Sequence, residues 1–199
     1  MCIYVTIPAT MEILAKLFGS PAKVKLMRLF LFNPEATFTL KDLKTRTRLQ
    51  GPVLNKEISA LVKLGLIKKG HTKKTSYGID QRFPYLSALK NLLITVSLHA
   101  DANLAKKFAK AGRIKLFLAS GVFLQEWDAR VDLLIVGDGL NMARVVKIIS
   151  EIEAEIGKEI SYSAFETEDF QYRLGIHDRL IRDILDFPHA TIVDKLGVV

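Results

Sequence analysis

The residues with the clearest potential for chemistry lie in the segment RVDLLIVGD, residues 130–138. Alternate residues of a β-strand share one face and lie about 6.6 Å apart, so two carboxylates there can hold divalent ions for phosphoryl transfer. This segment offers only Asp132, because Arg130 occupies the position two residues earlier. Asp128 lies about 13 Å away along an extended strand, and Asp138 lies farther still. A single aspartate on a buried strand is more often a structural residue than a catalytic one.

The sequence on both sides of Asp132 predicts the elements that position it. Apolar or alternating runs predict strands at residues 114–118, 131–136, 159–165 and 190–193. Capping residues and apolar periodicity predict helices at residues 102–111, from Asn141 to about Ile156, from Thr167 onward and at 176–185. Asp101 and Asn141 are the expected N-caps of the first two helices, which end at Gly112 and Gly157. Strands that alternate with helices are typical of an α/β or α+β domain.

This order of elements resembles the minimal nucleotidyltransferase fold, a small relative of the DNA polymerase β superfamily. The resemblance covers residues 113–197 and is strongest at VDLLIVGD, residues 131–138. The strings GKEISYSAFETEDF at 157–170 and RDILDFP at 182–188 are also typical of a group that joins a winged helix-turn-helix to this domain. The resemblance implies a small mixed sheet, a Gly-Ser loop that binds nucleotide phosphates, an Asp-x-Asp pair and a third acid on a later strand.

The chain departs from that catalytic pattern in every part. Ala119-Ser120 precedes Gly121, so the glycine of the phosphate-binding loop is displaced. Arg130 stands in place of the first acid, and Ser161-Tyr162-Ser163 carries no third acid. We therefore expect Ser120 and Asp132 to be remnants of a catalytic site that has lost its activity, with no metal site and no cofactor.

Arg130 stays protonated in proteins, so it would repel a metal ion. It is instead a candidate for anion binding, or for an ion pair with Asp132. The alternative is an active transferase that depends on Mg²⁺, with Asp132 and an acid from elsewhere in the chain as ligands.

The positive charge of the chain is concentrated in its first half. The chain has a net charge of +8, but residues 1–90 hold 16 Lys/Arg and 5 Asp/Glu, a net charge of +11. Residues 91–199 hold 13 Lys/Arg and 16 Asp/Glu, a net charge of −3. A solvated basic surface is the simplest explanation, but the asymmetry favours a polyanionic partner and two domains with different roles.

Three helices are predicted in the basic half. The first begins at Ser20-Pro21, ends at Asn33-Pro34, and buries Val24, Met27 and Leu31. The second begins at a capping box formed by Thr39 and Asp42, with Leu40 and Leu43 facing inward. The third begins at Gly51-Pro52, ends at Gly65, and buries Leu54, Ile58, Leu61 and Val62.

Two short strands, at 66–69 and 76–79, follow these helices and flank a basic loop at 70–74. Helices and hairpin in this order resemble the winged helix-turn-helix of bacterial and archaeal transcriptional regulators. LNKEISALVKLGLIKKG at 54–70 matches a recognition helix that leads into a wing.

A recognition helix enters the major groove, where polar side chains meet base edges and lysines neutralise phosphates. The candidate DNA-binding residues are Gln50, Asn55, Lys56, Ser59, Lys68, Lys69, Lys73 and Lys74. A winged helix that contacts another protein, with its lysines merely solvated, is the alternative.

We therefore expect an α+β protein with a winged helix-turn-helix at 1–82, a connecting helix at 83–99 and a nucleotidyltransferase-like α/β domain at 100–199. The connecting helix carries an apolar stripe that packs either between the domains or against its copy in a dimer: Leu86, Leu89, Leu93 and Val96. The single cysteine, Cys2, excludes an internal disulfide. No apolar run approaches the length needed to span a bilayer.

The expected function is that of a cytoplasmic transcriptional regulator that binds double-stranded DNA as a homodimer. Its second domain would serve dimerisation, the binding of a protein partner, or the sensing of a nucleotide or other ligand. Two alternatives stay open. One is the active Mg²⁺-dependent transferase, and the other is an antitoxin-like interaction protein that neutralises a small helical toxin.

Overall fold

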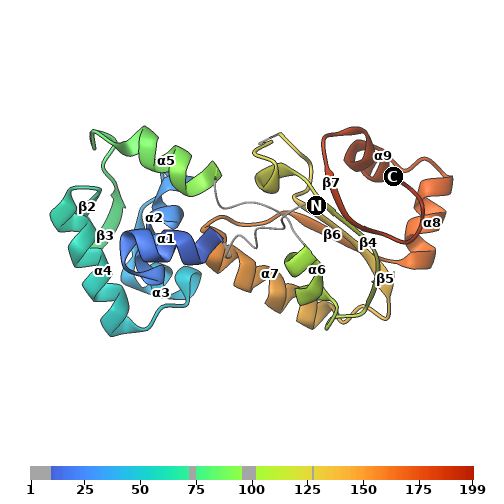
Figure 1. Cartoon of the computed structure of the whole chain (residues 1–199), viewed down its shortest axis with the longest axis horizontal. Coiled ribbons are helices and arrows are strands. Elements are labelled where there is room, and N and C mark those ends of the chain that lie inside the picture. The colour runs from blue at the N-terminus through green and yellow to red at the C-terminus, as the bar shows by residue number, and fades with distance from the viewer. Residues whose placement is uncertain (1–9, 72–74, 96–101, 127) are drawn as a thin grey trace, which may run out of the picture. The chain divides into compact units, whose positions relative to one another are not determined.

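The computed structural model of the chain describes residues 10–71, 75–95, 102–126 and 128–199 (Figure 1). Within these residues, helices are combined with two small sheets of three and four strands, so the protein belongs to the α+β class. The chain divides into two units, Met1–Ser97 with Glu153–Lys158, and Leu98–Ile152 with Glu159–Val199. In the described part of the chain, no helix is both long and apolar enough to cross a membrane.

The first unit combines helices with a three-stranded antiparallel sheet. Its helices are α1 (Thr10–Phe18), α2 (Pro21–Phe32), α3 (Leu40–Thr47), α4 (Gly51–Leu64) and α5 (Leu86–Thr95). Its strands, in the sheet order β1-β3-β2, are β1 (Phe38–Thr39), β2 (Ile67–His71) and β3 (Thr75–Ile79). Helix α1 has no counterpart in the sequence-based prediction, whereas α2, α3, α4 and the β2–β3 hairpin match it.

Local capping sets the ends of these helices as the sequence predicts. The Ser20 side chain accepts a hydrogen bond from the backbone N–H of Lys23 at the start of α2. Thr39 and Asp42 form the capping box of α3. Gly65 ends α4 with a φ of +80°, a left-handed conformation that favours glycine.

The core of the first unit takes buried residues from helices α1 to α5 and from all three strands. The predicted core residues Val24, Met27, Leu31, Leu43, Leu54, Ile58 and Leu61 are buried. Leu40 is an exception: it is exposed, because Phe38 of the preceding strand fills that side of the core with its ring 5.7 Å from that of Phe30. In α5, Leu93 is buried, and Leu86 and Leu89 pack on the same core; Val96 lies outside the described residues.

Residues 153–158 belong to this first unit. Their backbone carbonyl groups accept hydrogen bonds from side chains of α2 and of its C-cap residue, Asn33. The guanidinium of Arg28 donates to the carbonyl oxygen of Glu155 (3.0 Å), and the Asn33 amide donates to that of Gly157 (2.9 Å). A Cβ at Gly157 would lie 2.5 Å from the backbone nitrogen of Leu29. Only glycine therefore fits this approach.

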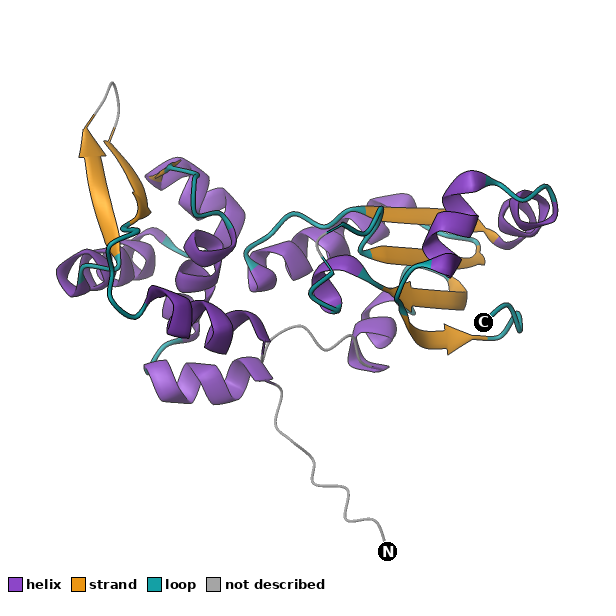
Figure 2. Cartoon of the chain, turned by 90° about the horizontal axis from the view of Figure 1, so that it is seen from above, coloured by secondary structure: helices purple, strands orange, loops and turns teal. Residues whose placement is uncertain are grey.

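The second unit alternates strands and helices. Its helices are α6 (Ala102–Phe108), α7 (Met142–Ile156, whose last turn lies in the first unit), α8 (Thr167–Gly175) and α9 (Arg179–Asp186). Its strands are β4 (Arg113–Ala119), β5 (Leu133–Asp138), β6 (Tyr162–Glu166) and β7 (Ala190–Asp194). They form one sheet in the order β6-β5-β4-β7 (Figure 2), in which β5 and β6 run parallel and the other pairs run antiparallel.

Helices cover both faces of this sheet, with α6 and α7 on one side and α8 and α9 on the other (Figure 1). Leu116, Leu118 and Leu134 pack against α8 and α9, whereas Phe117 lies against Phe108 of α6, with ring centroids 5.2 Å apart. Strand β5 is buried from Leu133 to Gly137, as its apolar run predicts.

The second unit contains the predicted helices and strands, but several boundaries differ: β5 and β6 begin two and three residues later than predicted, at Leu133 and Tyr162. Asn141 caps α7 by accepting a hydrogen bond from the Arg144 N–H, and Gly157 follows the helix with a φ of +86°. The helix predicted at 176–185 begins later, at Arg179, because His177 is left-handed and Asp178 accepts the N–H groups of Leu180 and Ile181. Helix α6 ends at Phe108 rather than at residue 111. Asp101, its expected N-cap, lies outside the described residues.

Candidate functional site

Helix α4 presents a polar outer face. Asn55, Lys56, Ser59 and Lys63 are exposed on α4 itself, and Gln50, its N-cap residue, is exposed at its start. The Gln50 side chain makes no capping hydrogen bond to the helix. Its amide is therefore not held at the helix terminus and can contact a partner.

The only carboxylate of α4 points away from that face. Glu57 is buried, and its Oε2 lies 3.7 Å from the Nζ of Lys23 in α2. Since α4 contains no other Asp or Glu, its exposed face combines lysines with neutral polar groups. Such a face attracts an anionic partner and has no carboxylate to repel it.

Helix α3 adds further basic side chains beside α4. Lys41, Lys44, Arg46 and Arg48 are exposed. The one acid of α3, Asp42, accepts hydrogen bonds from the Thr39 hydroxyl (2.7 Å) and the Thr39 N–H (2.9 Å). These hydrogen bonds hold the pKa of Asp42 below its usual value.

The β2–β3 hairpin continues the basic surface. Lys68 and Lys69 are exposed, but they are successive strand residues and so point to opposite sides of the hairpin. After the hairpin, Asp80 binds the Arg82 guanidinium (3.3 Å), which lowers the pKa of Asp80. The other two predicted wing residues, Lys73 and Lys74, lie outside the described residues.

Asp132 sits in the second unit as a hydrogen-bond acceptor for backbone groups. It is 9% exposed, and its Oδ1 accepts the N–H of Val122 (2.6 Å) while its Oδ2 accepts the N–H of Ser161 (2.8 Å). The hydroxyl of Ser120 donates to the carbonyl oxygen of Val131 (2.5 Å). Both of the predicted remnant residues thus connect the loop after β4 to the chain entering β5.

Gly121 permits this arrangement. Its φ is +55°, and a Cβ at this position would collide with the Asp132 carboxylate. The glycine that follows Ser120 therefore allows the loop to approach Asp132 closely enough for the Val122 N–H to donate to it.

Arg130 forms an ion pair with Asp183 of α9, with 2.5 Å between Nε and Oδ2. The carboxylate that pairs with this guanidinium is therefore Asp183 and not Asp132, and anion binding by Arg130 stays a prediction. The Oδ2 of Asp183 also lies 3.9 Å from the Nε of Arg179, in the same helix.

The turn between β5 and α7 is closed by a carboxylate that the sequence does not identify. Glu166 accepts the N–H groups of Gly139 (3.0 Å) and Leu140 (2.9 Å). Asp138 accepts the Thr167 hydroxyl and lies 3.4 Å from Lys115, and both interactions lower its pKa. Glu166 thus occupies the position that an anionic ligand would take at the Gly137-Asp138-Gly139 turn.

Among residues 10–71, 75–95, 102–126 and 128–199, no three His, Cys, Asp or Glu side chains are grouped to hold a metal ion. Comparison of the chain with protein-family models, with curated proteins and with solved structures finds no significant match.

Proposed function

We propose that this chain is a cytoplasmic transcriptional regulator whose first unit binds double-stranded DNA through α4 and the β2–β3 hairpin. The proposal is carried by one observation, the one-sided charge of residues 36–82. This segment holds eleven Lys/Arg and three Asp/Glu. Each acid is engaged within the unit: Asp42 with Thr39, Glu57 with Lys23, and Asp80 with Arg82.

The order α2, β1, α3, α4, β2, β3 supports a winged helix-turn-helix mode of binding. In that mode the N-terminal part of α4 enters the major groove, where Gln50 and Asn55 can pair with base edges. Lys56 and Lys68 or Lys69 would contact phosphates, which gives affinity without sequence preference.

The second unit, in the same proposal, is a nucleotidyltransferase-like domain that no longer catalyses transfer. Both carboxylate oxygens of Asp132 already accept backbone N–H groups, which supports a structural role for this residue. Arg130, at the position of the missing acid, pairs with Asp183. The domain would then serve dimerisation, partner binding or ligand sensing.

A titration of a fluorescent random-sequence DNA duplex with the full chain at increasing salt concentrations tests DNA binding. The affinity should be measurable at low salt and should fall steeply as salt rises, because bound lysines release condensed counterions. Absence of binding at low salt, or an affinity independent of salt, would contradict the proposal.

Incubation of the chain with each labelled nucleoside triphosphate, Mg²⁺ and DNA, RNA or protein acceptors tests the loss of catalysis. We expect no transfer of label. Transfer that is abolished in Asp132→Asn, in a variant shown to be folded by circular dichroism, would restore the transferase assignment.

A further inference from the structure

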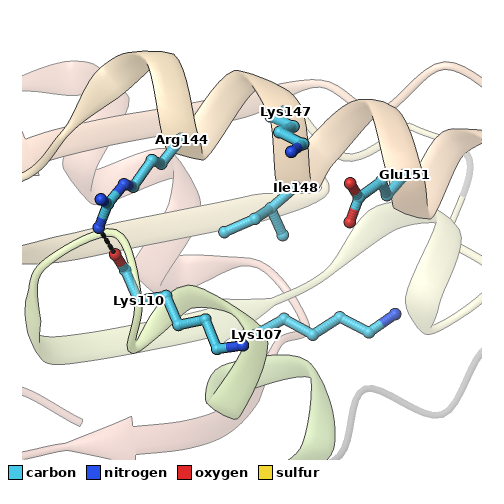
Figure 3. A pocket seen from close by; sticks show the side chains of 6 residues that line it. All are labelled: Lys107, Lys110, Arg144, Lys147, Ile148 and Glu151. Carbon is cyan, nitrogen blue, oxygen red and sulfur yellow. Dashed lines mark hydrogen bonds between the residues drawn. The ribbon is translucent and has the colours of Figure 1, made fainter.

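A basic hollow of about 570 Å³ lies between α6 and α7 in the second unit. Its lining combines four cations, one apolar side chain and one carboxylate: Lys107, Lys110, Arg144, Lys147, Ile148 and Glu151 (Figure 3). This volume is in the range of small-molecule sites.

Three of the four cations of this hollow lack the ion pairs that some basic residues of the unit form. Residues 91–199 contain more Asp/Glu than Lys/Arg, and Arg113, Arg130 and Arg173 each form an ion pair. In contrast, Lys110, Arg144 and Lys147 have no carboxylate partner among the described residues. Among the described residues that line the hollow, Glu151 is the one carboxylate beside these cations, so a bound anion would reduce their mutual repulsion.

The arrangement of these side chains is partly fixed. Arg144 donates from Nη1 to the carbonyl oxygen of Lys110 (2.8 Å), which holds its guanidinium at one end of the hollow. Arg144, Lys147, Ile148 and Glu151 recur at helical spacing, so they lie along one side of α7. Figure 3 shows Lys107 and Lys110 extended along the opposite side.

We infer that this hollow binds a compact polyphosphate, a small ligand with at least two phosphate groups close together. Two or three cations from different elements match the charge and spacing of adjacent phosphates. Ile148 and the lysine stems offer an apolar surface for an organic group attached to them. Glu151 at the far end disfavours a continuous row of phosphates, such as a nucleic acid backbone.

The hollow is separate from the remnant catalytic residues. Asp132 precedes β5, whereas Arg144 lies in the first turn of α7, which follows the other end of that strand. None of Ser120, Arg130 and Asp132 lines the hollow. Since the four cations of the hollow outnumber its one carboxylate, Glu151, it would hold a polyphosphate without a divalent ion. A polyphosphate bound here would be the ligand sensed by the second unit in the proposed function. Regulation by this ligand rests on that proposed function, whereas binding of the ligand does not.

Isothermal titration of the full chain in EDTA, without DNA, tests the inference. The probes are ATP, GTP and inorganic tripolyphosphate, with orthophosphate and sulfate as simple anions. The test variant is Lys110→Gln/Lys147→Gln, since both residues are exposed and, in the part of the chain that the structure describes, neither side chain forms an ion pair or a hydrogen bond. The matched control is Lys106→Gln/Lys195→Gln, which removes the same charge from a neighbouring hollow.

We expect a polyphosphate to bind, with orthophosphate and sulfate much weaker, and the test variant to lose about tenfold or more in affinity. A higher affinity for ATP or GTP than for tripolyphosphate would show that the ligand is an organic polyphosphate. Equal affinities would show that the hollow recognises the phosphate chain alone. Three results would overturn the inference: no binding, equal binding of orthophosphate, or equal losses in both double variants. In a parallel titration with Mg²⁺ in place of EDTA, binding that requires Mg²⁺ and disappears in Asp132→Asn would also overturn it. None of these results bears on DNA binding by the first unit, which is tested separately by the titration with a DNA duplex.

Discussion

Asp132 illustrates how one residue type can serve either catalysis or structure. Asp132 uses both oxygens to accept N–H groups from Val122 and Ser161, so its carboxylate joins the loop after β4 to the chain that enters β6. These donors lie 10 and 29 residues away in sequence, so no local pattern could reveal them. The sequence predicts that Asp132 is isolated from other acids; only the fold shows what its carboxylate binds.

Replacement of Asp132 by alanine should destabilise the protein, because two backbone donors lose their acceptor in a buried site. We expect a loss of about 2–5 kcal/mol in the free energy of unfolding. Chemical denaturation followed by circular dichroism measures it. Asp128→Ala, at an exposed position nearby, is the control and should change stability by less than about 0.5 kcal/mol. An Asp132→Ala variant as stable as this control would contradict the structural role.

Gly121 should be more sensitive to substitution than another left-handed glycine of the same unit. Gly121 and Gly139 have φ values of +55° and +62°, but only at Gly121 would a Cβ meet another atom, the Asp132 carboxylate. Gly139→Ala should cost about 1–2 kcal/mol for the backbone conformation alone. Gly121→Ala should cost at least about 1 kcal/mol more. Equal losses, measured by the same denaturation, would show that the close approach to Asp132 contributes nothing.

At the scale of elements, the sequence predicts best those features that depend on neighbouring residues. The capping box of α3 and the glycine end of α4 require residues within four positions of one another, and both are confirmed. Two predictions were wrong. Leu40 was predicted to be buried, but Phe38 of β1 fills that part of the core. The last helix was predicted to begin at residue 176, but the left-handed conformation of His177 places its start later in the chain. The basic hollow went unpredicted, since Lys110 and Arg144 are 34 residues apart in sequence.

The capping box of α3 should support the basic surface of the first unit. Thr39→Ala should lower the free energy of unfolding by about 1 kcal/mol, as N-cap replacements usually do. Thr45→Ala, at an exposed position within α3, is the matched control and should change it by less than about 0.5 kcal/mol. Equal effects of both variants in thermal denaturation would exclude a stabilising cap.

The same cap makes the stability of the first unit dependent on pH. Hydrogen bonds from Thr39 lower the pKa of Asp42 in the folded state, so its contribution is present above the unfolded-state value of about 3.9. That contribution is lost as pH falls through the lower folded-state pKa. As pH is lowered from neutral into this acidic range, the free energy of unfolding should therefore decrease less for Asp42→Asn than for the native chain. Denaturation measured at several pH values tests this difference. An equal decrease in the free energy of unfolding of both proteins would contradict a pKa of Asp42 lowered by the cap.

At the scale of the whole molecule, the chain joins two units of opposite charge, and we expect it to act on DNA as a homodimer. Two recognition helices related by a two-fold axis would match the half-sites of a palindrome. Light scattering should give twice the chain mass of 22.3 kDa at concentrations that bind DNA. A mass of one chain, together with one chain bound per DNA site, would exclude the dimer.

If the outer face of α4 binds DNA, two single-lysine variants of the chain should differ in how their affinity for DNA depends on salt concentration. Lys56→Gln removes a charge from α4, and Lys90→Gln removes the same charge from an exposed position on α5. If Lys56 contacts a phosphate, the slope of log K against log salt concentration should fall in magnitude by about 1 for Lys56→Gln. It should stay unchanged for Lys90→Gln. Native slopes in both variants, or the same reduction in both, would contradict binding through α4.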